Sequence, residues 1–502
     1  MQDCERPSLE RQLLSNQLWE TVAFIAKAAF MLGFTPWMIR VWGAQGYGEF
    51  ALASSAFVLL SLVDLGIRAR TRLALCADHD RNQWSSILWH SASTFAVIAA
   101  GTIAISLVLT ACGLFGAVFK ISPANRDLLF VTTAMSMLVM TSGLLLEPLI
   151  VAGRIGQTKC ASAAGWLTSI PCVVVVLDWK GGAIAATTTW LGCLFAANLF
   201  VLWLNRRLLR AKLGSAYDVL SLHKFIGKLK EAFWINICNA TWMTKTYGVT
   251  LLIAALNGPA AAGFFFILLR LSEIISALGA VSTDVLLTEL AQNSGPEQRR
   301  HAFLSSYSWA LTLCSHAGLL IAVFARDFFN LWLHPATPIS IFAGLLITML
   351  GLASAFNRTL TWAAIGLGLP KTAAKWGIAE AISFVAAVLL GSFIFGLLGQ
   401  LGFALAATLA LIPVARAVSV RLGASLGTIW LQPFRDVAPF AAINAAILFA
   451  ASITPLPMAK FIAIPICTGV AFANLSRWLS KRERNSRQEL SGRTISAAQS
   501  PC

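Results

Sequence analysis

Long apolar stretches recur along almost the whole of this chain. We count about fourteen segments of roughly twenty mostly apolar residues, the length that an α-helix needs to cross the hydrocarbon core of a bilayer. Only 12% of the 502 residues are charged and 57% are hydrophobic, whereas soluble domains carry about twice that charged fraction. The sequence therefore predicts an all-α polytopic membrane protein with almost all of its mass in the membrane.

The predicted spans are joined by connections too short to fold as separate domains. The longest connection, residues 205–231, contains an amphipathic stretch that fits either a helix on an anionic membrane surface or a solvated linker. The predicted spans are 18–41, 48–67, 86–111, 128–152, 160–178, 182–204, 232–254, 261–284, 302–324, 339–363, 374–397, 401–420, 436–453 and 458–475.

The first two predicted spans form a hairpin whose orientation across the membrane is indicated by its charged residues. A short glycine-rich turn separates them, and a basic cluster follows the second, as cytoplasmic anchors do. The glycines are Gly43, Gly46 and Gly48, and the basic residues are Arg68, Arg70 and Arg72. We therefore place the turn outside and the basic cluster in the cytoplasm.

The distribution of positive charge agrees with this orientation. The chain has 38 Lys and Arg residues against 22 Asp and Glu residues, and most of the basic residues lie in connections on one side of the predicted spans. This asymmetry is typical of cytoplasmic loops and does not indicate nucleic-acid binding. We expect both termini to be cytoplasmic and membrane lipids to surround the protein.

Sequence motifs for nucleotide binding and metal binding are absent. The ten cysteines are scattered, mostly inside apolar segments, without metal-ligand spacing. There is also no phosphate-binding GxxxxGK[ST] loop and no HExxH. We therefore expect a transporter and not an enzyme, with no catalytic residues, no metal and no organic cofactor.

Three weak internal matches indicate a duplication. They pair Gly43 with Gly258, Lys159 with Lys371 and Ala183 with Ala404, at offsets between 212 and 221 residues. Chance similarity between helices rich in Gly and Ala is the alternative. A parallel duplication predicts two pseudo-symmetric six-helix lobes and two further helices. The predicted parts are an N-terminal cytoplasmic segment (1–17), an N-lobe (18–204), a cytoplasmic link (205–231), a C-lobe (232–420), two additional spans (421–476) and a basic cytoplasmic tail (477–502).

The first hairpin resembles that of bacterial oligosaccharide flippases, the polysaccharide-transporter branch of the multidrug/oligosaccharidyl-lipid/polysaccharide exporter superfamily. The shared features are a basic residue, a turn ending in Tyr-Gly and a helix ending in Leu-Asp-Leu-Gly. Here they are Arg40, Tyr47-Gly48 and Val63-Asp64-Leu65-Gly66. The resemblance implies a protein of the bacterial inner membrane that moves a lipid-linked oligosaccharide for O-antigen, capsule or exopolysaccharide assembly. Glycan polymerase or ligase machinery is a possible partner.

Three cations lie well inside predicted spans, where a charge is costly unless it faces a cavity or a partner. Lys27, Lys245 and Arg270 are about 13, 20 and 17 Å from the inner face at 1.5 Å per residue. In the family resembled, their helices would meet between the lobes, where the cations could bind a diphosphate and Asn239 could bind sugar hydroxyls. Lys27 could instead reach the inner interface, and Arg270 could pair with Glu273; Lys245 has no acid at helical spacing.

Acidic residues inside the spans suggest a second role. Glu147, Glu273 and Glu380 could bind a proton or Na⁺ and couple transport to an ion gradient. Glu147 precedes Pro148, so a helix kink is also expected there.

Other functions fit the same architecture. A lipid II flippase would also use a cationic cavity and fourteen helices, whereas a drug/cation antiporter of the same superfamily would favour an acidic cavity. A membrane-embedded glycan polymerase or ligase would usually carry a long outer loop with catalytic residues, and the outer connections here are short.

Overall fold

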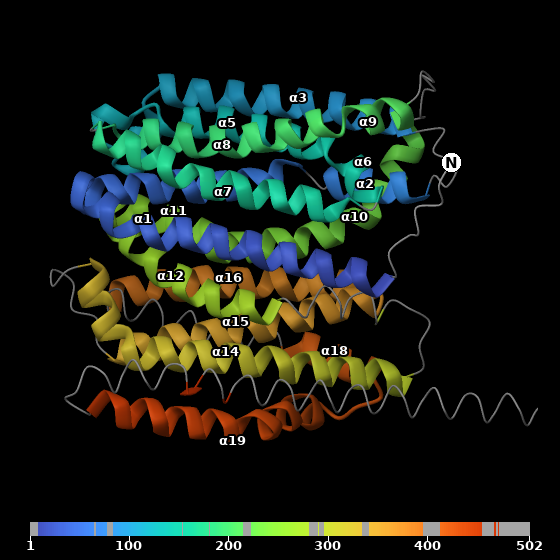
Figure 1. The fold of residues 1–502 in the computed structure, drawn as a ribbon, viewed down its shortest axis with the longest axis vertical. Helices are drawn as coiled ribbons and strands as arrows, with labels where there is room; N and C mark the ends of the chain where they lie inside the picture. Colours follow the sequence, from blue (N-terminus) through green and yellow to red (C-terminus); the bar gives the residue numbers. More distant parts are fainter. Residues whose placement is uncertain are drawn as a thin grey trace, which may run out of the picture. The chain divides into compact units, whose positions relative to one another are not determined.

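The computed structural model describes residues 9–64, 67–77, 84–152, 154–179, 181–213, 222–280, 290, 296–333, 341–394, 412–453, 466–467 and 470. All regular secondary structure in these ranges is helical, and the helices are drawn in Figure 1. This confirms the all-α membrane fold predicted from the apolar stretches.

The contacts divide the chain into two compact units. Unit 1 comprises residues 1–269 and Gly377–Val385, and unit 2 comprises Arg270–Trp376 and Ala386–Cys502. The division falls inside two helices, α12 (Pro259–Ala280) and α16 (Pro370–Ile394), so that a short piece of α16 belongs with unit 1.

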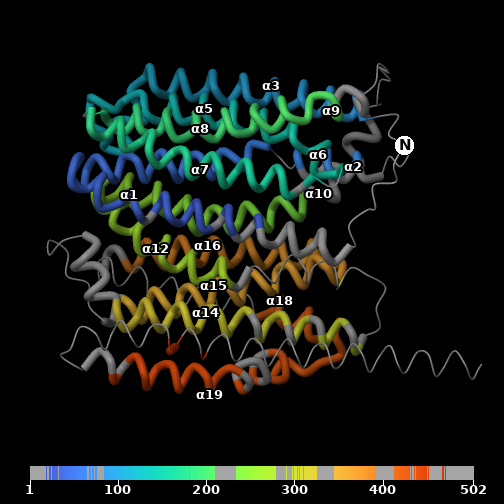
Figure 2. Tube along the Cα trace, viewed as in Figure 1, coloured from blue at the N-terminus to red at the C-terminus, as the bar shows by residue number. Residues whose placement is uncertain are grey.

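Unit 1 consists of helices that run side by side, as the Cα trace in Figure 2 shows. Its principal neighbours are α1 against α7, α7 against α8, and α8 against α5. Besides parts of α12 and α16, its elements are α1 (Leu9–Leu60), a 3₁₀ turn (Ser61–Asp64), α2 (Ile67–Ala77), α3 (Trp84–Ala111), α4 (Leu114–Phe119), a 3₁₀ turn (Pro123–Asn125), α5 (Leu128–Leu145), α6 (Glu147–Val151), α7 (Ile155–Asp178), α8 (Ala183–Leu204), α9 (Arg206–Leu213), α10 (Leu222–Met243), a π-helical turn (Thr244–Gly248) and α11 (Val249–Asn257).

Unit 2 is built around α14, which packs against both α15 and α19. Small residues permit close helix contacts here, as is common in membranes: a Cβ at Gly351 would lie 2.8 Å from Ile275 Cβ. The Thr348 hydroxyl donates a hydrogen bond to the Gly318 carbonyl at 2.7 Å. Besides parts of α12 and α16, the elements are α14 (Pro296–Leu333), α15 (Ile341–Gly366), α18 (Ile412–Arg421) and α19 (Leu426–Ile453).

Eight apolar helical segments within the described ranges are long enough to cross a membrane. One of them, Ile25–Asp64, has 40 residues, about twice the length of one crossing. It includes a non-helical residue, Gly43, between the two predicted spans of the first hairpin, and it covers most of both spans. Most of the predicted spans 458–475 and 401–420 lies outside the described residues.

The glycine turn of the first hairpin reappears in the predicted second lobe. Gly43 has φ 71° and ψ 179°, and Gly258, which the internal match aligns with it, has φ 91° and ψ 169°. Residues other than glycine essentially never adopt these backbone angles. The two aligned glycines therefore break their helices in the same way, which supports the duplication at this point.

The tips of these two hairpins touch each other. A Cβ on Gly48 would lie 1.9 Å from the Pro259 carbonyl oxygen, and a Cβ on Gly263 would lie 2.9 Å from Gly48 Cα. Gly48 and Gly263 are also aligned by the internal match. The two glycine-containing turns therefore meet within unit 1 through glycines that the internal match aligns.

Aromatic side chains fill the centre of unit 1. Phe30 and Trp190 are fully buried with ring centroids 5.9 Å apart, and Trp166 lies 5.4 Å from both rings. Aromatic pairs at this separation add to the packing energy of the buried surface. The cluster joins α1, α7 and α8, which positions Lys27, one turn before Phe30.

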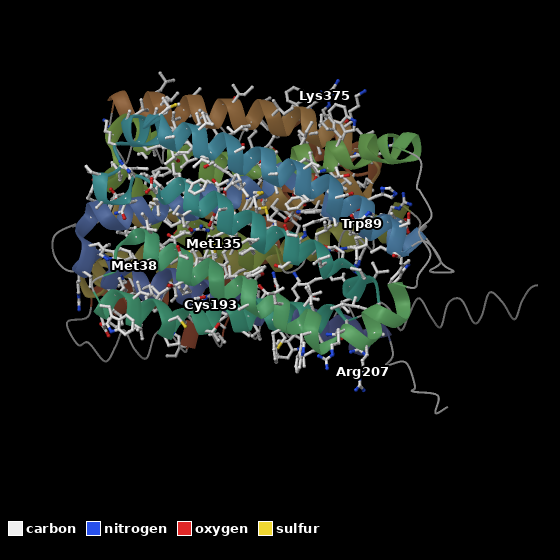
Figure 3. All side chains as sticks on the ribbon, turned by 90° about the horizontal axis from the view of Figure 1, so that it is seen from above. Met38, Trp89, Met135, Cys193, Arg207 and Lys375 are labelled. Atoms are coloured by element: carbon white, nitrogen blue, oxygen red, sulfur yellow. The ribbon has the colours of Figure 1, made fainter. Side chains whose placement is uncertain are left out.

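The outer surface of unit 1 has the character expected of a lipid-facing helix bundle. On α3, Trp89, Val97 and Ile105 are 66%, 74% and 63% exposed. At the start of α9 the Arg207 side chain points away from the helices (Figure 3). Apolar exposure along the helices and positive charge at one end are typical of a multi-pass membrane protein.

Candidate functional site

Two sequence candidates of opposite charge meet in unit 1. Lys245, at the π-helical turn after α10, lies with its Nζ atom 2.6 Å from Oε1 of Glu380 on α16. The Lys245 side chain is 15% exposed and that of Glu380 is 3% exposed. The acid that Lys245 lacks along its own helix is supplied by a helix more than one hundred residues later in the chain.

Local backbone features bring these two side chains together. A π-helical turn inserts an extra residue into a helix and is frequent at functional sites, and here it contains Lys245. One turn earlier on each helix, a Cβ on Gly377 would lie 3.0 Å from Thr241 Oγ1 and 3.7 Å from Thr241 Cβ. Only a small residue at position 377 lets α16 come this close to α10.

Lys27 lies beside the aromatic cluster of unit 1. Its Nζ atom is 6.0 Å from the centroid of the Trp166 ring, and its side chain is half-buried. An ammonium over an indole face is stabilised by the ring quadrupole. This contact places the Lys27 ammonium beside the Trp166 indole of α7.

Arg270 and Glu273 form the internal pair that the sequence offered as an alternative. The Arg270 Nη1 atom donates to Glu273 Oε2 within α12, and the two side chains are 8% and 15% exposed. The contacts assign this pair to unit 2, whereas Lys27 and Lys245 belong to unit 1. Asn239 is half-buried on α10, two turns before Lys245.

Glu147 is occupied by two arginines of the basic cluster. Its fully buried carboxylate accepts hydrogen bonds from Arg68 at 3.2 Å and from Arg72 at 2.8 Å. Arg72 donates to both carboxylate oxygens, which is the planar fork geometry typical of strong Arg–carboxylate pairs. The helix breaks between α5 and α6, at Leu146, beside the expected Glu147-Pro148 kink. The cluster thus tethers α2 to α6, in addition to any role as a cytoplasmic anchor.

Sequence reasoning missed a polar network at the turn of the first hairpin. Glu49 is 1% exposed and accepts hydrogen bonds from the Ser122 amide at 2.7 Å and from Asn125 Nδ2 at 2.5 Å. Lys120 donates to the carbonyl of Leu256, at the end of α11, at 3.0 Å. The sequence feature that could have indicated this network is Glu49 itself, an acid at the start of an otherwise apolar run.

The geometry therefore sorts the seven candidates into distinct places. Lys245 and Glu380 form a partly accessible ion pair. Lys27 lies beside the Trp166 ring. Glu147 is bound by Arg68 and Arg72. Within the described ranges no group of three or more His, Cys, Asp or Glu side chains could hold a metal ion.

Comparison with solved structures shows that this fold is that of membrane transporters that include flippases and multidrug exporters. The lipid II flippase MurJ, in its inward closed conformation, superimposes with a TM-score of 0.68 at 12% identity over 92% of this chain and 99% of that chain. The MATE multidrug transporter DinF-BH, in complex with R6G, gives 0.58 at 14% identity over 84% and 98%.

A third similar structure concerns the charge of a binding pocket. It is a transporter of the MOP superfamily from Pyrococcus furiosus, described as having a binding pocket of reverse polarity, with a TM-score of 0.53, 14% identity and coverage of 82% and 96%. No protein-family profile matches the chain, and no curated protein matches it by sequence. At these identities the similarity establishes the fold.

Proposed function

We propose that this chain is a flippase of the bacterial inner membrane that moves a polyprenyl-diphosphate-linked oligosaccharide from the cytoplasmic to the outer leaflet. The substrate class follows from charge, because cations retained inside apolar helices fit a phosphorylated passenger better than a cationic drug. The fold shared with a lipid II flippase supports this class of activity.

The observation that carries the proposal is the partly exposed Lys245. An ammonium at this depth in a predicted span is kept at a considerable cost, and Glu380 offsets that cost in the structure. Lys27 and Arg270 would add positive charge, and Asn239 would donate to sugar hydroxyls. Alternating access between inward and outward states would carry the bound head group across.

Lipid II is the second candidate substrate. The highest TM-score among the structures compared above belongs to a lipid II flippase, and lipid II carries the same polyprenyl diphosphate. A drug/cation exporter would favour an acidic cavity, and the presence of Lys27, Lys245 and Arg270 inside predicted spans argues against it. Coupling to a proton or Na⁺ gradient through Glu273 or Glu380 remains part of the proposal.

Deletion of the gene tests the substrate class directly. We expect a lipid-linked glycan to accumulate on the cytoplasmic leaflet, where its chemical identity can be read by mass spectrometry of extracted lipids. Accumulation of lipid II would select the second candidate. If no lipid-linked glycan accumulates and cells retain cationic dyes instead, the drug/cation exporter is correct and the flippase proposal is wrong.

A further inference from the structure

Burial of the Lys245–Glu380 pair has an unfavourable desolvation free energy. Taking two charges out of water is usually not repaid by their attraction, so that well-packed apolar residues of similar volume often stabilise a protein more. Both side chains are largely buried, and the Nζ–Oε1 distance is 2.6 Å. Stability alone therefore does not explain why these two residues face each other.

The two members of the pair differ in access. The Lys245 side chain is 15% exposed, whereas Glu380 is 3% exposed. Lys245 is therefore the more accessible member of the pair, and its ammonium has three N–H donors. A diphosphate carries more negative charge and more acceptor oxygens than a carboxylate, so it can compete for the same donors.

The pair also connects two segments that are far apart in the sequence. It joins the π-helical turn after α10 to the Gly377–Val385 piece of α16, which belongs with unit 1 although the rest of α16 belongs with unit 2. The close approach at Gly377 and Thr241 lies one turn away on the same two helices. Loss of the ion pair would remove the charged contact that holds this piece of α16 to α10.

We propose that Glu380 is a built-in competitor of the substrate: its carboxylate occupies Lys245 in the empty protein, and the substrate diphosphate displaces it and thereby releases α16 from α10. This rests on the proposed function and adds how binding is coupled to a helix movement. Because coupling is reciprocal, Glu380 must weaken diphosphate binding by the same factor as diphosphate weakens the α10–α16 contact.

Binding of farnesyl diphosphate to the purified full-length protein tests the competition. We expect Glu380→Gln, which removes the charge and keeps the shape, to bind roughly fivefold or more tightly than wild type, and Lys245→Gln to lose most of the affinity. Glu49→Gln is the matched control, since it neutralises another buried carboxylate that lies in the hairpin-turn network; its affinity should match wild type.

The outcomes separate the two proposals. If Lys245→Gln loses affinity but Glu380→Gln binds no more tightly than wild type, the competition is wrong and the phosphate site stands. If Lys245→Gln binds as well as wild type, or if wild type and Glu380→Gln both fail to bind, the phosphate site is wrong as well. A melting curve of each variant in detergent establishes that the compared proteins are folded.

A cross-link tests the release of α16. Thr241→Cys with Gly377→Cys would place two Cβ atoms about 3.7 Å apart, within the range of a disulfide, in a Cys238→Ala background because Cys238 lies one turn earlier on α10. We expect oxidation to stop translocation, a reductant to restore it, and farnesyl diphosphate to slow cross-linking. Full translocation by the oxidised protein, or cross-linking that diphosphate does not slow, would overturn the proposal.

Discussion

At the scale of single residues, the buried acids of this chain differ in the cations with which they form ion pairs. Three acids considered for ion coupling are all paired with cations, but in different settings: Glu147 with two arginines, Glu273 within its own helix and Glu380 across helices. Helical spacing could reveal only the pair at Arg270 and Glu273. The other two pairs depend on tertiary packing, which no local pattern contains.

The Glu147 cluster gives a prediction about stability. Arg72→Ala should lower the melting temperature in detergent by several degrees, because it leaves a fully buried carboxylate with only one of its two arginines. Arg126→Ala is the control, since its pair with Asp127 is 77% and 53% exposed and exposed pairs contribute about 0–1 kcal/mol. Equal melting temperatures for the two variants would contradict a stabilising role for the cluster.

At the scale of elements, the glycines of the two aligned hairpins decide how the helices turn and meet. Their positive φ angles and their mutual contact explain why glycine occurs at Gly43, Gly48, Gly258 and Gly263. The sequence alignment at these four positions came from one short match, and the backbone agreement at Gly43 and Gly258 is independent of it. The third match includes Ala404, which lies outside the described residues.

Gly48 is the most sensitive of these positions. A Cβ there would lie 1.9 Å from the backbone oxygen of Pro259, so Gly48→Ala must push the two hairpin tips apart. We expect this variant to lose abundance or, where it folds, to lose most of its translocation. Gly101→Ala is the matched control, because a Cβ at that helical position meets nothing within 4 Å. A Gly48→Ala protein with normal abundance and normal translocation would contradict the tip contact.

At the scale of the whole molecule, composition and apolar length were sufficient for the membrane fold. A backbone crosses the bilayer only as a helix or within a closed barrel, and apolar runs of about twenty residues fit helices. The hairpin turn was also predicted, since Gly43 lies between two apolar runs. The site was only half predicted: the sequence identified Lys245 and Glu380 separately, and only the fold could pair them. The Glu49 network, which depends on Ser122 and Asn125, was not predicted at all.

Translocation by reconstituted protein tests the central claim, that buried cations bind a phosphorylated passenger. The measurement is the rate at which a polyprenyl-diphosphate-linked oligosaccharide crosses vesicle membranes that contain either wild type or the triple variant Lys27→Gln, Lys245→Gln and Arg270→Gln. Arg126→Gln, an exposed cation, serves as the control. At equal protein content we predict a rate at least roughly tenfold lower for the triple variant, since charge-assisted hydrogen bonds contribute about 1.5–3 kcal/mol each, and a wild-type rate would contradict the claim.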